Sequence, residues 1–186
     1  MKSLCLTLFL LCNTTLNNFD FNYSTQEEFV EGIIECTQLT NSYLPPPSRS
    51  IIIISVAQAA LESDWGNSRF AKEGNNFYGI IETDPTSKHL KALGDPSIMI
   101  RVYERKCESV ADYIQLLNRH HLFKAYQDLR VKQYISEEID VIALIETLEG
   151  YAVDPNYVSK LKATIGYLLR EYPNLFHVSI LSLIHI

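Results

Sequence analysis

Basic residues are scarce in this sequence of 186 residues. It has 16 lysines and arginines against 22 aspartates and glutamates, a formal net charge of −6, and no long basic run. Proteins that bind nucleic acid do so mainly through Lys and Arg side chains that neutralise phosphate charge. The charge balance therefore excludes nucleic acid as an expected partner. An anionic polymer would have to be held by shape, stacking and hydrogen bonds.

The sequence also lacks the motifs that commonly mark metal, nucleophile or phosphate chemistry. His120 and His121 are adjacent, so they do not face one point on a helix, and no H-E-x-x-H motif or cysteine cluster accompanies them. Ser63 lacks the G-x-S-x-G context of a serine hydrolase. Gly74 and Gly79 belong to no phosphate-binding loop. We therefore expect neither a metal nor a cofactor.

No apolar run is long enough to cross a bilayer. Residues 51–61 are interrupted by polar side chains, and Leu4–Cys12 (LCLTLFLLC) is too short. The latter follows the positive Met1–Ser3 and has the size of a signal-peptide core, although no small-residue cleavage triplet follows it. We predict a signal peptide over residues 1–19, export to the periplasm or the outside, and no stable membrane insertion after its removal. A buried N-terminal apolar segment is the alternative.

Internal repeats and low-complexity linkers are missing as well. The proportions of hydrophobic (47%) and charged (20%) residues are those of an ordinary globular protein. We predict one domain over residues 20–175, large enough to support its own core, and a monomer. Residues 176–186, whose apolar end has no periodic context, are predicted to be a non-structural tail.

Cysteines are few, and two of the four, Cys5 and Cys12, lie in the predicted leader. The remaining two, Cys36 and Cys107, are too far apart for a C-x-x-C metal or redox motif. Two interpretations stay open. In an exported protein the pair could form one disulfide that ties the first helix to a later one, or the two could be unrelated buried thiols.

The pattern that is present is mostly helical, with one small β region. Ser24 or Thr25 is a candidate N-cap of the first helix, Gly66 follows the end of the second, and Asp154 with Pro155 is the clearest start signal. Four isoleucines open the second helix, but the Ala- and Leu-rich continuation favours a buried helix over a strand. Helices are predicted over about 25–41, 49–65, 68–72, 108–118, 121–130, 137–148 and 155–171, and strands over 77–81 and 98–103.

Chemistry is expected where the second helix meets the β region. Glu62 lies in the last turn of an otherwise apolar helix, near the partial negative charge of the helix C-terminus. Trp65, three residues on, could pack against Glu62 and exclude water. Both effects raise the pKa of a carboxyl group. An acid kept protonated near neutral pH can protonate a leaving glycosidic oxygen, whereas a solvated glutamate beside a core tryptophan would have no such role.

The segment from Ala57 to Ile80, AQAALESDWGNSRFAKEGNNFYGI, closely resembles the signature of the glucosaminidase family of peptidoglycan hydrolases, in particular its Bax-like branch. The resemblance continues through residues 101–120 and 150–161 and covers about 27–170. It implies a mostly α, lysozyme-like α+β fold with a small β region inserted after the central catalytic helix. It also implies hydrolysis of β-1,4 bonds beside N-acetylglucosamine in bacterial cell-wall glycan.

The resemblance carries roles to individual residues. Glu62 matches the catalytic acid of the family. Asn76, Phe77 and Tyr78 match the loop that floors the cleft beside it, and Tyr151 falls on the tyrosine near the reacting sugar. For the two tyrosines, packing in the core or at the rim is the alternative.

Two further residues, Trp65 and Tyr157, are candidate substrate contacts, although Tyr157 could equally serve packing. The second carboxylate is less defined. Between the predicted strands, Asp84 is the first choice over Glu82 and Asp95, although Asp-Pro is a common turn. Alternatively, the 2-acetamido group of the substrate attacks the anomeric carbon, steered by Tyr151, and no protein nucleophile is needed.

These expectations amount to an endo-β-N-acetylglucosaminidase whose partner is a peptidoglycan glycan strand, with Glu62 as general acid and then base. A lytic transglycosylase or muramidase on the same scaffold is the nearest alternative, because one glutamate also suffices there. A glycan-binding module that has lost catalysis is an alternative from a different class. A phage-borne wall-degrading enzyme would differ only in its delivery.

Overall fold

The computed structural model describes residues 19–41 and 50–176. Most of the predicted signal peptide and of the predicted tail lie outside these ranges. No helix within them is both long enough and apolar enough to cross a membrane. The elements are α2 (Gln26–Asn41), α3 (Ser50–Ser63), α4 (Arg69–Gly74), β1 (His89–Lys91), β2 (Met99–Arg101), α5 (Lys106–Arg119), η1 (His121–Phe123), α6 (Lys124–Ser136), α7 (Val141–Glu146), η2 (Glu149–Tyr151) and α8 (Tyr157–Glu171).

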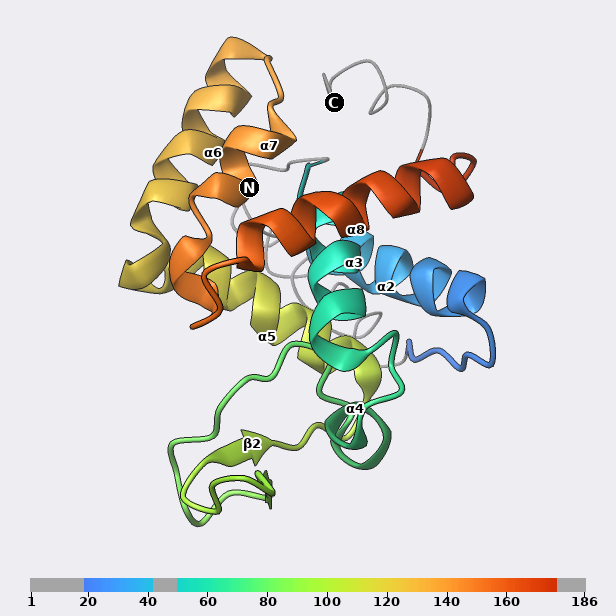
Figure 1. Cartoon of the computed structure of the whole chain (residues 1–186), viewed down its shortest axis with the longest axis vertical. Coiled ribbons are helices and arrows are strands. Elements are labelled where there is room, and N and C mark those ends of the chain that lie inside the picture. The colour runs from blue at the N-terminus through green and yellow to red at the C-terminus, as the bar shows by residue number, and fades with distance from the viewer. Residues whose placement is uncertain (1–18, 42–49, 177–186) are drawn as a thin grey trace, which may run out of the picture.

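Helix α3 is the centre of the fold. Eleven of its fourteen residues are buried, so it is covered on all sides rather than along one stripe. Helices α2, α7 and α8 pack against it, and Figure 1 shows α3 in the middle of the helical part. The predicted buried helix is confirmed, because burial outweighs the β-propensity of its four isoleucines.

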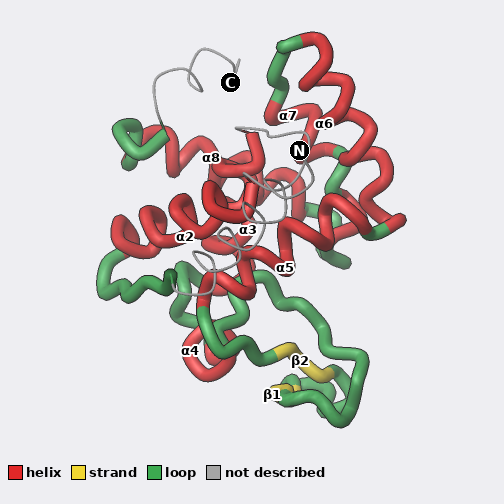
Figure 2. Tube along the Cα trace, turned by 180° about the vertical axis from the view of Figure 1, so that it is seen from behind, coloured by secondary structure: helices red, strands yellow, loops and turns green. Residues whose placement is uncertain are grey.

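The helices and the β region occupy opposite ends of the molecule. Figure 2 shows the two short strands and the long green loops at one end, beyond α4, and helices α6 and α7 at the other. Helix α5 leads from the β region back along α2, with which it is in contact. The small β region inserted after the central helix therefore matches the predicted architecture.

Helices α2 and α7 begin where a side chain caps the first free backbone amides of the helix. Thr25 caps α2, since its hydroxyl accepts a hydrogen bond from the Glu28 amide (3.2 Å) while the Glu28 carboxylate accepts one from the Thr25 amide (3.1 Å). Asp140 caps α7 through the Ala143 amide (2.9 Å), so this helix begins at Val141 and not at residue 137.

Helix α8 begins at Tyr157, two residues after the predicted start at Pro155. The Asp154 carboxylate accepts a hydrogen bond from the Asn156 amide (2.9 Å), and the Asp154 carbonyl accepts one from the Tyr157 amide (3.0 Å). These bonds hold a turn ahead of the helix. Tyr157 is therefore the first helical residue rather than the third.

The predicted strand over residues 77–81 is wrong except at its end, where Ile81 forms an isolated antiparallel bridge with Ile100 of β2. The side chain of Asn76 takes up the backbone groups of this segment: its Oδ1 accepts from the amides of Tyr78 (3.3 Å) and Ile80 (3.1 Å), and its Nδ2 donates to the Ile80 carbonyl (2.9 Å). Gly79 adopts φ +67°, which favours glycine. The segment is consequently a compact loop closed by one buried amide.

The second predicted strand is confirmed as β2. It pairs antiparallel with β1, with Leu90 opposite Ile100. Strand β1 lies inside the segment that was expected to be a loop between the two strands. Three residues flanked by turn-forming sequence are too short to show the alternation that identifies a strand.

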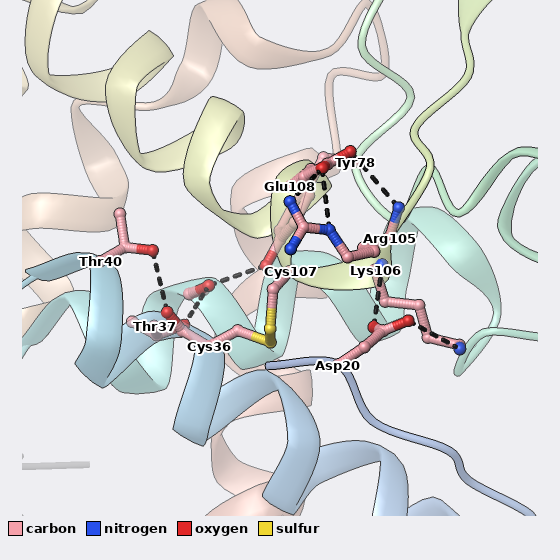
Figure 3. The surroundings of a disulfide bond; sticks show 10 residues. Asp20, Cys36, Thr37, Thr40, Tyr78, Arg105, Lys106, Cys107 and Glu108 are labelled. Carbon is pink, nitrogen blue, oxygen red and sulfur yellow. Dashed lines mark hydrogen bonds and ion pairs between the residues drawn. A yellow bond between two sulfur atoms is a disulfide. The ribbon is translucent and has the colours of Figure 1, made fainter. Parts of the chain in front are cut away.

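Cys36 and Cys107 are bonded in the structure, so the disulfide is the alternative that the fold adopts. Their Cα atoms lie 5.2 Å apart, in the usual range for a bridge. Figure 3 shows the bond joining α2 to the start of α5, with the ion pair between Lys106 and Asp20 beside it. Both sulfur-bearing side chains are buried, so the bridge belongs to the core rather than to the surface.

Helix α3 ends sharply, because three successive residues take left-handed φ angles: Asp64 (51°), Trp65 (55°) and Gly66 (77°). The Ser63 hydroxyl oxygen accepts a hydrogen bond from the Gly66 amide (2.8 Å). The Tyr23 hydroxyl donates to the Gly66 carbonyl (2.9 Å) and holds the turn from outside. The helix therefore stops two residues before the predicted end.

We predict that reduction of the disulfide lowers stability without unfolding the chain at room temperature. The bond closes a loop between positions 71 residues apart, which corresponds to about 4 kcal/mol of chain entropy and roughly 10 °C in Tm for a domain of this size. Thermal melts with and without dithiothreitol measure the shift. The Cys36→Ser/Cys107→Ser variant is the control, since its Tm must not respond to reductant. An unchanged wild-type Tm in dithiothreitol would contradict the prediction.

The turn after α3 is sensitive to an added methyl group. In Gly66→Ala the new Cβ would lie 2.4 Å from the Tyr23 hydroxyl oxygen, at a left-handed φ, and we expect a loss of about 1–3 kcal/mol in the free energy of unfolding. Gly94→Ala is the matched control, because a Cβ there has no neighbour within 4 Å. Urea titrations compare the two variants, and equal midpoints would show that the turn is not restrained as described.

Candidate active site

A cavity of about 530 Å³ opens beside the C-terminal end of α3. Its walls come from the end of α3, the loop of residues 78–83, strand β2, helix α5 and the short helices η1 and η2. The polar side chains among its described lining are Glu62, Tyr78, Thr83, Arg101, Asp112, His120 and Tyr151. Three of the sequence-predicted residues, Glu62, Tyr78 and Tyr151, therefore meet at one cavity.

Glu62 stands at the wall of this cavity in the last turn of α3. Its side chain is half-buried, and burial raises the pKa of its carboxyl group. The Tyr157 hydroxyl, a hydrogen-bond partner of the carboxyl group, opposes this shift and lowers the pKa. Burial is the larger effect, so Glu62 holds its proton to a higher pH than a solvated glutamate does.

A cluster of tyrosines surrounds Glu62. The rings of Tyr151 and Tyr157 stack with centroids 5.7 Å apart, and the ring of Tyr78 stacks on Tyr113 at 3.9 Å. The Tyr151 hydroxyl donates to the carbonyl of Tyr78 (2.9 Å), which ties η2 to the loop after α4. Burial raises the pKa of the Tyr151 phenol, so this group remains a neutral phenol beside the acid.

Two of the predicted loop residues build the cavity rather than line it. Asn76 is buried, and its amide holds the loop by bonding Ile80 and the carbonyl of Arg101 (2.9 Å). Phe77 is fully buried and packs its ring against Phe29 at 5.5 Å. Only Tyr78, of the three, contributes to the lining.

Trp65 faces a different part of the surface. Its ring packs edge-on against Phe29 (6.4 Å) and Tyr167 (5.5 Å), and it lines a separate hollow with Gln26. The left-handed turn after α3 redirects the chain, so the spacing of three residues does not place the indole on the cavity side of Glu62. Tyr78, Phe123 and Tyr151, rather than Trp65, line the cavity with Glu62.

The acids between the strands are engaged elsewhere. Asp84 is exposed and its carboxylate accepts hydrogen bonds from the Thr86 amide (2.9 Å) and hydroxyl (2.7 Å), which lower its pKa. Asp95 forms a similar turn. Glu82 pairs with Arg101 (2.9 Å). None of the three lines the cavity, so the structure lends no support to Asp84 as the second carboxylate.

Asp112 is a cavity-lining acid that the sequence analysis missed. It lies on α5 and accepts hydrogen bonds from Arg101 (2.6 Å) and from the Tyr103 hydroxyl (2.7 Å). Leu116 and His120, four and eight residues further on, line the same cavity. The i, i+4 spacing of these residues is the signal that could have placed Asp112 on a shared face.

His120 lies at the rim as a cap. Its Nδ1 accepts a hydrogen bond from the Leu122 amide (3.3 Å) at the start of η1, and its ring stacks on His121. Residues 19–41 and 50–176 contain no group of three His, Cys, Asp or Glu side chains placed to hold a metal ion. The polar groups that line the cavity are the carboxyl groups of Glu62 and Asp112, the phenols of Tyr78 and Tyr151, the Arg101 guanidinium, the Thr83 hydroxyl and the His120 imidazole.

The sequence is similar to known glucosaminidases and peptidoglycan hydrolases. Residues 49–169 match the family described as Glucosaminidase, mannosyl-glycoprotein endo-beta-N-acetylglucosaminidase. The sequence is 30% identical to exo-glucosaminidase LytG of Bacillus subtilis over 92% of this chain and 64% of LytG. It is 31% identical to the peptidoglycan hydrolase FlgJ of Salmonella typhimurium over 61% of this chain and 38% of FlgJ. Protein bax of Escherichia coli is 28% identical over 61% and 39% of the two chains.

The chain thus spans less than two thirds of the length of these curated relatives. Among solved structures, the glycoside hydrolase domain of Salmonella typhimurium FlgJ superposes with a TM-score of 0.60 at 23% identity, covering 86% of this chain and 98% of that domain. This likeness confirms the fold, a mostly helical, lysozyme-like domain with a small two-stranded sheet. Since the family match covers most of the chain, the protein belongs to the glucosaminidase family.

Proposed function

We propose that the protein is an endo-β-N-acetylglucosaminidase that cleaves β-1,4 bonds beside N-acetylglucosamine in peptidoglycan. The observation that carries the proposal is the half-buried Glu62, whose pKa is raised by burial, at the wall of a cavity that it shares with Tyr151. Membership of the glucosaminidase family supports the reaction class. The naming of LytG as a glucosaminidase and of FlgJ as a peptidoglycan hydrolase supports the substrate.

In this proposal Glu62 acts first as an acid. Its retained proton passes to the glycosidic oxygen as the bond to the anomeric carbon breaks. The resulting carboxylate then takes a proton from the water that attacks the same carbon, which returns Glu62 to its starting state. One carboxyl group with a raised pKa is sufficient for both steps.

The arrangement around Tyr151 favours attack by the 2-acetamido group of the substrate. The other acid in the described lining, Asp112, is already engaged, because its carboxylate pairs with Arg101 and accepts a hydrogen bond from the Tyr103 hydroxyl. The Tyr151 hydroxyl donates its hydrogen to the Tyr78 carbonyl, so its oxygen is left to accept a hydrogen bond from the N–H of an acetamido group. That contact would turn the acetamido oxygen toward the anomeric carbon.

Action on peptidoglycan requires a location outside the cytoplasm, which agrees with the predicted export to the periplasm or the outside. The acidic overall charge, −6, gives no general attraction to an anionic wall polymer. Recognition must consequently come from the cavity. Tyr78 and Tyr151 line it and offer aromatic rings and polar groups for sugar rings and acetamido groups. Tyr157, the other predicted tyrosine contact, is buried and lies outside the lining, so it supports the site from behind.

We expect Glu62→Gln to lower turnover of purified peptidoglycan by about 10²–10⁴-fold, because the amide cannot supply a proton. Glu73→Gln, an exposed glutamate on the next helix, is the control and should turn over like the wild type. Mass spectrometry of the products identifies the bond. Reducing-end N-acetylglucosamine fits the proposal, whereas reducing-end or anhydro N-acetylmuramic acid indicates a muramidase or a lytic transglycosylase. Glycan binding without any product, unaffected by Glu62→Gln, would indicate a binding module.

The raised pKa of Glu62 also predicts a pH-dependent change in stability. The folded protein binds this proton more tightly than the unfolded chain does, so wild-type stability falls as pH rises from about 4.3, the unfolded value, through the folded pKa. Glu62→Gln removes this loss, which is about 1.4 kcal/mol for every tenfold difference in proton affinity between the folded and unfolded states. Urea unfolding should show that the stability of the variant relative to the wild type increases as the pH is raised above about 4.3. A difference that stays constant with pH would argue against a raised pKa.

A further inference from the structure

Gln58 is a buried amide in the core, one helical turn before Glu62. It is fully buried on α3, and both ends of its side chain are hydrogen-bonded. The Tyr113 hydroxyl, from α5, donates to Gln58 Oε1, and Gln58 Nε2 donates to the Tyr157 hydroxyl oxygen (2.6 Å), from α8. Residues four apart share one face of a helix, so Gln58 and Glu62 both face Tyr157.

The hydrogen bonds of this cluster have a single direction. A phenol has one hydrogen to donate, and Tyr113 donates its hydrogen to Gln58 Oε1. The amide then presents its Nε2–H to the oxygen of Tyr157, whose own hydrogen is left to bond the Glu62 carboxyl group. The result is an ordered relay from Tyr113 through Gln58 and Tyr157 to Glu62.

Packing alone does not require an amide at this position. The neighbours of Gln58 on α3 include Ile54, Ala57 and Ala59, which are fully buried and apolar. An apolar side chain of similar shape would fill the space, whereas an amide here needs a partner for both of its ends. The structure supplies both partners from other helices, and one of them touches the acid of the cavity.

We propose that Gln58 is a positioning residue that holds the Tyr157 hydroxyl against the Glu62 carboxyl group, so that the acid keeps one orientation toward the cavity. The inference rests on the proposed role of Glu62. Without Gln58, the Tyr157 hydroxyl could turn toward another acceptor, and the carboxyl group would lose the bond that fixes its rotation.

Several other titratable or charged groups lie near Glu62 and influence the pKa of its carboxyl group. Tyr157 of α8 and Tyr151 of η2 lie within electrostatic reach of its charge. Tyr78, Arg101, Asp112 and His120 line the same cavity from the loop, β2 and α5. Because the Tyr157 bond stabilises the charged form of Glu62, weakening that bond raises the pKa of the carboxyl group.

The test compares two isosteric replacements with matched controls. Gln58→Met and Tyr157→Phe should lower kcat by about tenfold to a hundredfold and leave KM nearly unchanged, since the acid is misplaced while the cavity is retained. Gln133→Met removes another buried glutamine, which bonds the Asp140 carbonyl (2.9 Å), and Tyr167→Phe removes another phenol hydroxyl. Both controls should keep wild-type kcat. A control that loses as much kcat as its partner would overturn the proposal.

A second measurement does not depend on activity. Carbon-13 NMR of the Glu62 carboxyl group should show its pKa raised in both Gln58→Met and Tyr157→Phe, and the double variant should equal Tyr157→Phe alone, because Gln58 acts through Tyr157. An unchanged or lowered pKa, or additive effects in the double variant, would overturn the relay. If the pKa rises as expected while Glu62→Gln retains turnover, the relay stands and the proposed function fails.

Discussion

The burial of helix α3 on every side is the constraint on which the rest of the structure depends. A helix without a solvent face must satisfy each polar side chain inside the protein. Ser55 therefore bonds Thr37 (3.0 Å) and Tyr78 (2.8 Å), and Gln58 bonds tyrosines of α5 and α8. These bonds fix α2, α5, α8 and the loop that carries Tyr78 in position around α3. Glu62, in the last turn of the same helix, lines the cavity.

The same burial sets the electrostatics of the site. Desolvation raises the pKa of Glu62 and of Tyr151 and Tyr157, so each of these groups holds its proton more tightly than it would in water. The sharp end of α3 matters equally, because the left-handed turn from Asp64 to Gly66 leaves Glu62 in the last turn and sends Trp65 to another face. A disulfide between α2 and α5 holds the helix that carries Asp112.

Sequence signals predicted the structure correctly where the interactions that determine it are between residues close together in the chain. The Thr25 cap, the apolar helix over α3 and the place of Glu62 near its end depend on residues within one or two turns. The error over residues 77–81 has a specific cause. A run of apolar residues fits a strand, but the buried amide of Asn76 bonds the backbone of Tyr78 and Ile80 and folds the segment into a loop. Only its end reaches β2, through the bridge between Ile81 and Ile100.

The sequence by itself indicated the family, through the resemblance of the contiguous run from Ala57 to Ile80, and the helical core, through the spacing of its apolar residues. It also placed Glu62 near the end of the central helix. Only the tertiary structure decided which groups meet that acid. Tyr157 lies 99 residues from Gln58 along the chain and Tyr113 lies 55 residues from it. Hydrogen bonds between such distant positions leave no periodicity in the sequence. For the same reason Asp112 lines the cavity while Asp84, nearer to Glu62 in the chain, forms a turn on the surface.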